Sequence, residues 1–529
     1  MAETDPTSPD AVRTVVLGSG PAGVTTVVGL ARRGVPVLLV EGGTDRESDD
    51  DRALNAGAAA EGVWGHEPLG EHRRRVLGGA STAWGGRCIP LEPIDFEPRD
   101  WVPGSGWPIP YAEFHRWLPE ACDLLQIPET DFRRPSAAPL FGDDGAIDGA
   151  AIEVWSPPVV FSDVLRAAQQ QHPNLQVATG THVTRVRTAE DGTVVGLEAV
   201  RDGQPLTIEG ARFVLATGTL ENTRLLLDSP LAPSLPALGR YYQSHTFATD
   251  FAVTGPALPP DADFFRIGSA YARRRWQLSP QAQRDRRVGN VIGFVARPPV
   301  RGVSLHVDPL SALVGAVKIV RGNVTSPARL LGRRGELGVY ARVLVRTTPA
   351  FWVRVAAQTA RRRGRNRLPM LLPPRTASVH HVTVQGEHLP HPDSRVLLTT
   401  GTDRYGVPLL ATDIDFHRQD FETIDAFHRA LEAFLGARGY RAVTGPAEAL
   451  RSLARNMRLG FNSNAHHIGT ARMGTDRATS VVDPDCRVHG SANLYVAGAA
   501  VFPTSGHVNP TLSIVMLAAR LADHLAGTR

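Results

Sequence analysis

The sequence predicts an α/β fold with a Rossmann-like nucleotide-binding domain that is built from discontinuous segments. Three observations lead to this prediction. Residues 12–43 follow the order strand, glycine loop, helix, strand; residues 175–217 contain short alternating runs separated by turn residues; and "NLYVAG" (493–498) has the composition of a buried strand. We expect this last strand to return to the first sheet.

The first unit carries a dinucleotide-binding pattern. A buried run, Thr14 to Leu17, is followed by Gly18, Gly20 and Gly23 in the spacing GxGxxG, then by a helix that ends at Gly34. The glycines allow a tight turn and a close approach of the backbone to a pyrophosphate at the helix N-terminus. Glu41, at the end of the next strand, is placed to accept hydrogen bonds from ribose hydroxyls.

The later elements follow from periodicity. Residues 175–217 are expected to form short antiparallel strands, including "RFVLATG". Helices are expected over 219–229, 420–439 and 511–525, and the second of these has a clear amphipathic pattern.

Length and composition limit the possible classes. A chain of 529 residues is too long for one ordinary domain, and 42% hydrophobic residues can bury a large core. The formal net charge of +4 is small for this size, so we expect no nucleic-acid partner. Three cysteines without CxxC spacing, and an N-terminus without an apolar signal core, lead us to expect a cytoplasmic protein.

The loop after the first unit favours FAD over a nicotinamide cofactor. A nicotinamide dehydrogenase usually completes its cofactor domain with a second βαβ half. Here a Gly/Trp-rich loop, "VLGGASTAWGGRC" (76–88), intervenes. A cofactor held by both ends of the chain suits the long dinucleotide FAD.

These pieces together resemble the glucose-methanol-choline (GMC) oxidoreductase family, and most closely its bacterial, pyranose-oxidase-like branch. The resemblance covers nearly the whole chain and is weakest at 240–375. It rests on the N-terminal unit, "LGGASTAWGGR", "ATGTLENTRLLL", "HPDSRVLL", "HHIGTARMG" and "NLYVAGAAVFPTSGHVNPTLSIVMLAARLADHL".

The resemblance implies how the chain is divided. An FAD-binding domain would consist of residues 11–95, 175–240 and 456–529, and its last segment would carry the catalytic residues. A substrate-binding domain on an antiparallel sheet would cover 241–455, with 96–174 packed between the two.

The resemblance also implies the cofactor contacts. The implied FAD-binding positions, besides Gly18, Gly20, Gly23 and Glu41, are Gly79, Ser81, Trp84, Gly85, Val183, Gly498, Ala499, Asn509, Pro510 and Thr511. Some members of the branch attach the flavin covalently to a histidine of this loop, where the present chain has Ala83. We therefore expect non-covalent FAD.

The implied reaction is the oxidation of an alcohol by hydride transfer to the flavin, which needs a base and a second group to hold the oxygen. The family places a histidine before x-x-Gly-Thr and a histidine or asparagine at the start of the final helix. The matching residues are His466 as the base and Asn509 as the donor to the substrate oxygen. We expect His467 to pack behind His466, because adjacent residues of a strand point to opposite faces. A direct role for His507 stays open.

Several alternatives accompany this interpretation. The pairs His380–His381 and His388/His391 have no carboxylate or cysteine at ligand spacing, so we expect no metal. The basic stretch 326–367 is either a solvated surface or a peripheral membrane or partner contact.

The expected substrate is a small-molecule alcohol: a sugar, a polyol or a sugar-bearing metabolite. The electron acceptor is left open between O₂, a quinone and a redox protein. The alternatives are a membrane-associated dehydrogenase of a lipid or sterol-like alcohol and a non-redox flavin lyase.

Overall fold

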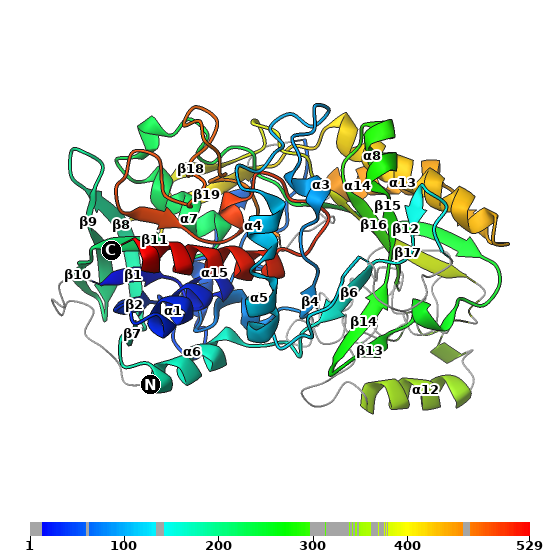
Figure 1. Cartoon of the computed structure of the whole chain (residues 1–529), viewed down its shortest axis with the longest axis horizontal. Coiled ribbons are helices and arrows are strands. Elements are labelled where there is room, and N and C mark those ends of the chain that lie inside the picture. Colours follow the sequence, from blue (N-terminus) through cyan, green and yellow to red (C-terminus); the bar gives the residue numbers. More distant parts are fainter. Residues whose placement is uncertain are drawn as a thin grey trace.

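The protein consists of two lobes, each built on its own sheet (Figure 1). The computed structural model describes residues 13–59, 63–133, 142–296, 379–458 and 466–528. Between 297 and 378 it describes helix α12 (Pro349–Ala360) and a few single positions.

The first lobe is built on a five-stranded parallel sheet whose strands come from distant parts of the chain. Its order is β21 (Leu494–Val496), β11 (Arg212–Leu215), β1 (Thr14–Leu17), β2 (Val37–Val40) and β7 (Leu175–Ala178). All four pairings are parallel. The strand "NLYVAG" therefore joins the first sheet, as predicted.

One prediction about this sheet was wrong. The run "RFVLATG" is not an antiparallel strand: β11 pairs in parallel with both β1 and β21 and lies inside the sheet. Parallel strands are buried on both faces and read as continuous apolar runs. A short run such as "RFVL" therefore carries no alternation from which its pairing could be deduced.

Helices cover the parallel sheet, and the C-terminal helix lies in the middle of the lobe (Figure 1). Helix α1 (Pro21–Arg32) packs against α6 (Phe161–Gln171) and α15 (Thr511–Gly527), and α7 (Thr219–Leu227) follows β11. The contact between α1 and α15 is close, because a Cβ on Gly29 would lie 2.6 Å from that of Ala522.

A three-stranded antiparallel sheet adjoins the first lobe. It contains β10 (Gln204–Ile208), β9 (Val194–Arg201) and β8 (Thr181–Thr188), in that order. The antiparallel prediction for this stretch is confirmed for these three strands.

The second lobe is built on a six-stranded antiparallel sheet. Its order is β20 (Arg441–Thr444), β12 (His245–Thr254), β17 (His380–Glu387), β16 (Val291–Ala296), β15 (Trp276–Leu278) and β5 (Ile147–Asp148). The amphipathic helix predicted over 420–439 is α13 (Arg418–Gly436), which packs on this sheet together with α14 (Pro446–Arg458). A second hydrophobic core lies between α13 and the sheet.

Smaller elements complete the molecule. One four-stranded sheet has the order β13 (Phe265–Ile267), β14 (Ala270–Arg274), β6 (Ile152–Trp155), β4 (Arg87–Cys88), and one three-stranded sheet the order β18 (Arg395–Thr402), β19 (Pro408–Asp413), β3 (Gly57–Ala59). The short helices are α2 (Asp49–Ala53), η1 (Gly79–Thr82), α3 (Pro93–Phe96), α4 (Tyr111–His115), α5 (Leu118–Leu124), η2 (Ala232–Ser234), η3 (Pro260–Ala262), α8 (Pro280–Arg286) and η4 (Ala499–Val501). The predicted fold class, a Rossmann-like lobe with an antiparallel second lobe, is confirmed.

None of the helices that the structure describes has the length and apolar character needed to cross a membrane. The basic stretch 326–367 lies mainly outside the described residues. Its described part is α12, where the side chains of Trp352 and Val353 are 44% and 70% exposed. A peripheral membrane contact through this stretch stays a prediction.

Candidate active site

A cavity of about 620 Å³ lies where the glycine loop, the loop 71–87 and the C-terminal segment meet. It brings together nearly all of the residues singled out in the sequence: Gly18, Gly20, Glu41, Gly79, Ser81, Trp84, Gly85, Val183, His466, Gly498, Ala499, Asn509, Pro510 and Thr511. Gly23 does not line it. A Cβ at that position would lie 1.9 Å from the Gly18 carbonyl oxygen, so Gly23 allows helix α1 to pack against the loop.

The glycine loop opens onto the cavity at the N-terminus of α1. Gly18 has φ of +101°, and a Cβ there would lie 2.6 Å from the Ala216 carbonyl oxygen. A Cβ on Gly20 would meet nothing within 4 Å, so this position faces open space. No side chain caps α1, which leaves its first amide groups for an anionic ligand.

Glu41 ties the glycine loop to the end of β2. Its Oε2 accepts hydrogen bonds from the Ser19 amide (2.9 Å) and the Ser19 hydroxyl (2.6 Å), and its Oε1 accepts from the Gly43 amide (2.8 Å). Burial raises the pKa of Glu41, although the Ser19 and Gly43 bonds oppose this. A carboxylate has about four lone-pair positions, so one remains for a ribose hydroxyl.

The loop that would face the flavin ring is held in place by its own side chains. Ser81 Oγ donates to the Gly78 carbonyl (2.6 Å) and accepts from the Phe161 amide (3.0 Å). Trp84 Nε1 donates to the Val159 carbonyl (2.9 Å). Gly85 has open space at its Cβ position. The polar groups of Ser81 and Trp84 therefore fix the loop, while the backbone and Gly85 face the cavity.

His466 and Asn509 meet at the cavity wall. The Asn509 Nδ2 lies 3.3 Å from His466 Nε2, and both side chains are partly exposed to the cavity. Burial lowers the pKa of His466 to about 3, and the positive charges of Arg87 and His72 act in the same direction. His466 is therefore neutral near pH 7 and can accept a proton.

His467 does not lie behind His466, contrary to expectation. Both histidines line the cavity. The reason is that residues 466 and 467 lie outside any strand: only the next residue, Ile468, forms an isolated bridge, with Gln243. The alternation of a strand does not apply to them. The His467 carbonyl accepts from the Thr219 hydroxyl at 2.5 Å, which fixes the backbone here.

His507 lies outside the cavity lining. It is fully buried, and its Nε2 contacts the Arg275 guanidinium. The structure thus places Asn509 at the cavity and turns His507 away from it.

Three further side chains near His466 were not singled out in the sequence. Arg87, in β4, lines the cavity and donates to Gln385 in β17 (2.7 Å). Gln385 Nε2 in turn lies 3.4 Å from Asn509 Oδ1. His245, the first residue of β12, lies with its Nδ1 3.0 Å from His466 Nδ1. Arg87 ends the quoted motif "LGGASTAWGGR" and could have been noticed there, whereas Gln385 and His245 lie in none of the quoted motifs.

A cluster of charges also contributes to the cavity lining. Glu221 pairs with Arg73 (2.8 Å) and with Arg75 (2.9 Å), and Arg224 also contacts it. Burial alone would raise the pKa of Glu221, but these three arginines hold it well below the ordinary range. The cluster is therefore fully ionised and fixes the arginine loop against α7.

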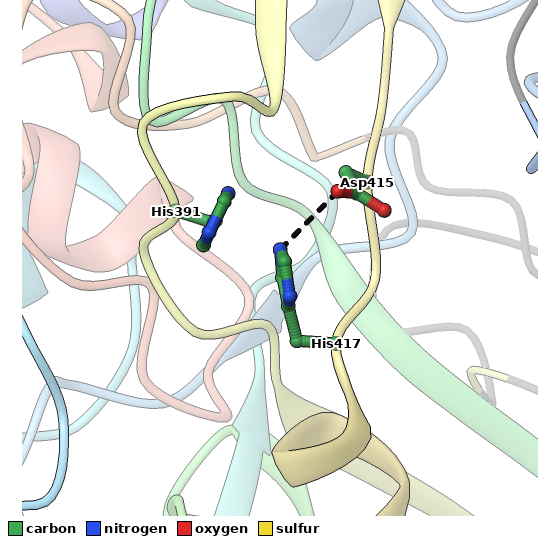
Figure 2. Close-up of side chains that lie close together, drawn as sticks. All are labelled: His391, Asp415 and His417. Atoms are coloured by element: carbon green, nitrogen blue, oxygen red, sulfur yellow. Dashed lines mark ion pairs between the residues drawn. The ribbon is translucent and has the colours of Figure 1, made fainter.

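A separate group of histidines lies away from the cavity (Figure 2). His391, Asp415 and His417 have potential ligand atoms within 4.8 Å of one another. The sequence had suggested no carboxylate near His391, but the fold supplies Asp415, which pairs with His417 at 3.3 Å. The centroids of the two imidazole rings are 3.5 Å apart, and the rings are tilted by 35°.

The hydrogen bonding of His391 does not favour metal binding. Its Nδ1 accepts the Asp393 amide at 3.2 Å, so the neutral ring carries its proton on Nε2. A metal ligand needs an unprotonated nitrogen, and histidine ligands usually donate from the other nitrogen. We therefore assign these three residues to an ion-paired surface group with two imidazole rings in contact.

The comparisons with known proteins agree with this geometry. Residues 390–518, which include His466 and Asn509, match the family model for GMC oxidoreductases. The chain is 24% identical to 6'''-hydroxyparomomycin C oxidase of Streptomyces lividus, over 97% of this chain and 92% of that protein. It is 26% identical to paromamine 6'-oxidase of Streptomyces fradiae, over 97% and 91%.

The fold is similar to that of a solved structure. The pyridoxine 4-oxidase from Mesorbium loti superposes with a TM-score of 0.53 at 17% identity, covering 98% of this chain and 100% of that one. The family match itself lies in the C-terminal part of the chain, where residues 390–518 form a GMC oxidoreductase domain.

Proposed function

We propose that this protein uses non-covalently bound FAD to oxidise the CH–OH group of a sugar or a sugar-bearing small molecule to a carbonyl. The observation that carries the proposal is the pair His466 Nε2 and Asn509 Nδ2. These atoms lie 3.3 Å apart in the wall of the same cavity that the glycine loop lines.

The cavity fits FAD at both of its ends. The open space at Gly20 and the uncapped N-terminus of α1 suit a pyrophosphate, and the remaining lone pair of Glu41 suits a ribose hydroxyl. At the other end, the loop 79–85, His466 and Asn509 would surround the flavin ring. That loop contains no histidine, cysteine or tyrosine, which supports non-covalent binding.

Asn509 and His466 have different roles toward the substrate hydroxyl. Asn509 Nδ2 donates a hydrogen bond to the oxygen and fixes its position, while the neutral His466 Nε2 removes its proton. The bound FAD supplies the acceptor for the hydride and its two electrons. The O–H and one C–H bond of the substrate break, a C=O bond forms, and the proton stays on His466.

The substrate class follows from the relatives and from the polar cavity wall. The two relatives act, by their names, on paromamine and on 6'''-hydroxyparomomycin C. The neighbours of His466 along the cavity lining include Arg87, His72 and His467. These side chains can hydrogen-bond the additional hydroxyl groups of a sugar, whereas a lipid or sterol would leave them unpaired at a desolvation cost.

The test is anaerobic reduction of the purified, flavin-loaded protein. Sugars, glycosides, polyols, aliphatic alcohols and sterols are added separately, and bleaching of the flavin absorption is recorded. We expect a sugar or glycoside to bleach the flavin, and acid precipitation to release the flavin into the supernatant. Readmission of air then distinguishes O₂ from other acceptors. Bleaching by sterols alone would overturn the substrate class, and turnover without bleaching would overturn the redox reaction.

A further inference from the structure

We propose that His245 is a positioning residue that keeps the ring proton of His466 on Nδ1, so that Nε2 faces the cavity as a free base. The inference rests on the proposed function, because it concerns the same proton transfer. It follows from one continuous chain of hydrogen bonds that begins at Arg87, a group that can only donate.

The first end of the chain is Arg87. Its Nη1 lies 2.7 Å from Gln385 Oε1, and its Nε lies 2.5 Å from Glu153 Oε2. Arginine has donors and no acceptor, so it must donate to Gln385. The oxygen of Gln385 is therefore the atom that faces Arg87, and its amide nitrogen faces the opposite way.

The side-chain amides of Gln385 and Asn509 continue the donor-to-acceptor direction that Arg87 sets. Gln385 Nε2 donates to the His507 carbonyl (2.7 Å), which can only accept, and to Asn509 Oδ1 (3.4 Å). Asn509 must then present its Nδ2 to His466 Nε2. Because an amide nitrogen has no accepting lone pair, His466 Nε2 accepts and carries no proton.

The direction of the chain then assigns the proton between the two histidines. A neutral His466 without a proton on Nε2 carries it on Nδ1, which lies 3.0 Å from His245 Nδ1. His466 Nδ1 therefore donates and His245 Nδ1 accepts.

This arrangement explains how His466 can take a proton inside the protein. When the substrate proton arrives at Nε2, the ring becomes positively charged while its Nδ1–H still points at a lone pair of His245. Burial lowers the pKa of His245 well below its ordinary value, so His245 does not take that proton. His245 is fully buried and touches His466 rather than the cavity, so it acts through His466.

The variants that test the proposal remove or keep the acceptor. His245→Leu removes it, and His245→Asn retains an acceptor oxygen near the position of Nδ1. His428→Leu is the matched control, because His428 is also fully buried, stacked on Phe251 in the second lobe with ring centroids 4.9 Å apart. We expect flavin reduction to slow by about 100-fold in His245→Leu. His245→Asn should recover most of that rate, and His428→Leu should leave it within about two-fold.

The pH profile separates loss of the base from loss of structure. The titratable and charged groups around the histidine pair are Arg87 in β4, His388 after β17, His72 in the cavity loop, His467 and His507. The wild-type rate should be flat above pH 5, because His466 is already neutral. In His245→Leu the rate of flavin reduction should rise with pH, because a base from the solvent must then remove the proton of the substrate hydroxyl. An unchanged rate and a flat profile in this variant would overturn the proposal.

A second measurement does not depend on turnover. In the flavin-loaded protein labelled with ¹⁵N-histidine, the signals that disappear in His466→Ala belong to His466. We expect these signals to show a protonated Nδ1 and an unprotonated Nε2, and a proton on Nε2 would refute the inference. If no alcohol reduces the flavin, the proposed function fails while this measurement still decides the tautomer.

Discussion

Two groups of histidines in this protein have similar composition and different surroundings. His245 and His466 belong to a chain of hydrogen bonds that begins at Arg87 and runs through Gln385 and Asn509. His391 and His417 are half-exposed, and their rings contact each other beside Asp415. A histidine becomes a defined base when its neighbours fix its proton and its surroundings keep it neutral. Mere proximity of histidines to a carboxylate does neither.

The largest effect on flavin reduction is expected for a substitution in the His245–His466 group, and none is expected in the His391–His417 group. His466→Ala should slow anaerobic flavin reduction by about 10³-fold, because the base is removed while the glycine loop and Glu41 still hold FAD. His417→Ala, the matched change in the surface group, should leave the rate within about two-fold. Stopped-flow reduction measures the rate, and the flavin absorption per protein checks that FAD is retained. Equal losses in the two variants would contradict the distinction.

A smaller effect is expected at Gln385, which orients Asn509. Gln385→Met keeps a similar shape but removes the donor to Asn509 Oδ1, so the amide can turn away from the substrate oxygen. We expect flavin reduction to fall by about 10-fold with little change in bound FAD. Gln283→Met is the control, because Gln283 is equally buried and donates to the Leu278 carbonyl and to Asn290. A loss of similar size in the control would attribute the effect to general destabilisation.

The smallest effect concerns stability in acid. The fully buried histidines whose pKa burial lowers are His245, His388, His428 and His507. The unfolded chain binds protons at these residues near pH 6.5, while the folded protein does so only at lower pH. Each therefore removes up to about 1.4 kcal/mol of stability per pH unit as the pH falls below 6.5.

Three buried carboxyl groups among the described residues act in the opposite direction. Burial raises the pKa of Asp95 and of Asp420 to about 7 and also raises that of Glu41, so the folded protein holds these protons where the unfolded chain has lost them. Since the histidines outnumber them, the melting temperature should fall by several degrees from pH 7 to pH 5. Thermal unfolding monitored at each pH measures this, and His428→Leu should make the fall smaller. A melting temperature that rises toward pH 5 would contradict the pKa directions.

The elements that sequence predicted well are those whose signal is local. The glycine loop, α13 and α15 each carry a pattern within about twenty residues, and the structure places them as expected. The parallel pairing of β11 was missed because a buried four-residue strand has no period of its own. Where the sequence motif already gave the spacing, as at His466 and Asn509, the structure brings the two side chains together.

The supporting groups could not be predicted for a different reason. Gln385 and His245 lie on neighbouring strands of the second lobe, and the pairing of β12 with β17 brings them next to Asn509 and His466. No short spacing in the sequence records that pairing. The contact between His391 and His417 also depends on the tertiary fold, because it requires β17 and α13 to pack close together. The same packing places Asp415 beside the two histidines.

The late position of β21 and α15 in the chain has a consequence for synthesis. During translation, β1, β2 and β11 leave the ribosome long before the strand that pairs with β11 and the helix that packs against α1. Until these last elements arrive, one edge of the parallel sheet is unpaired and the apolar surface of α1 is exposed to solvent. The nascent protein must therefore wait for its final segment before it can close around a nucleotide, and the same segment delivers His466 and Asn509.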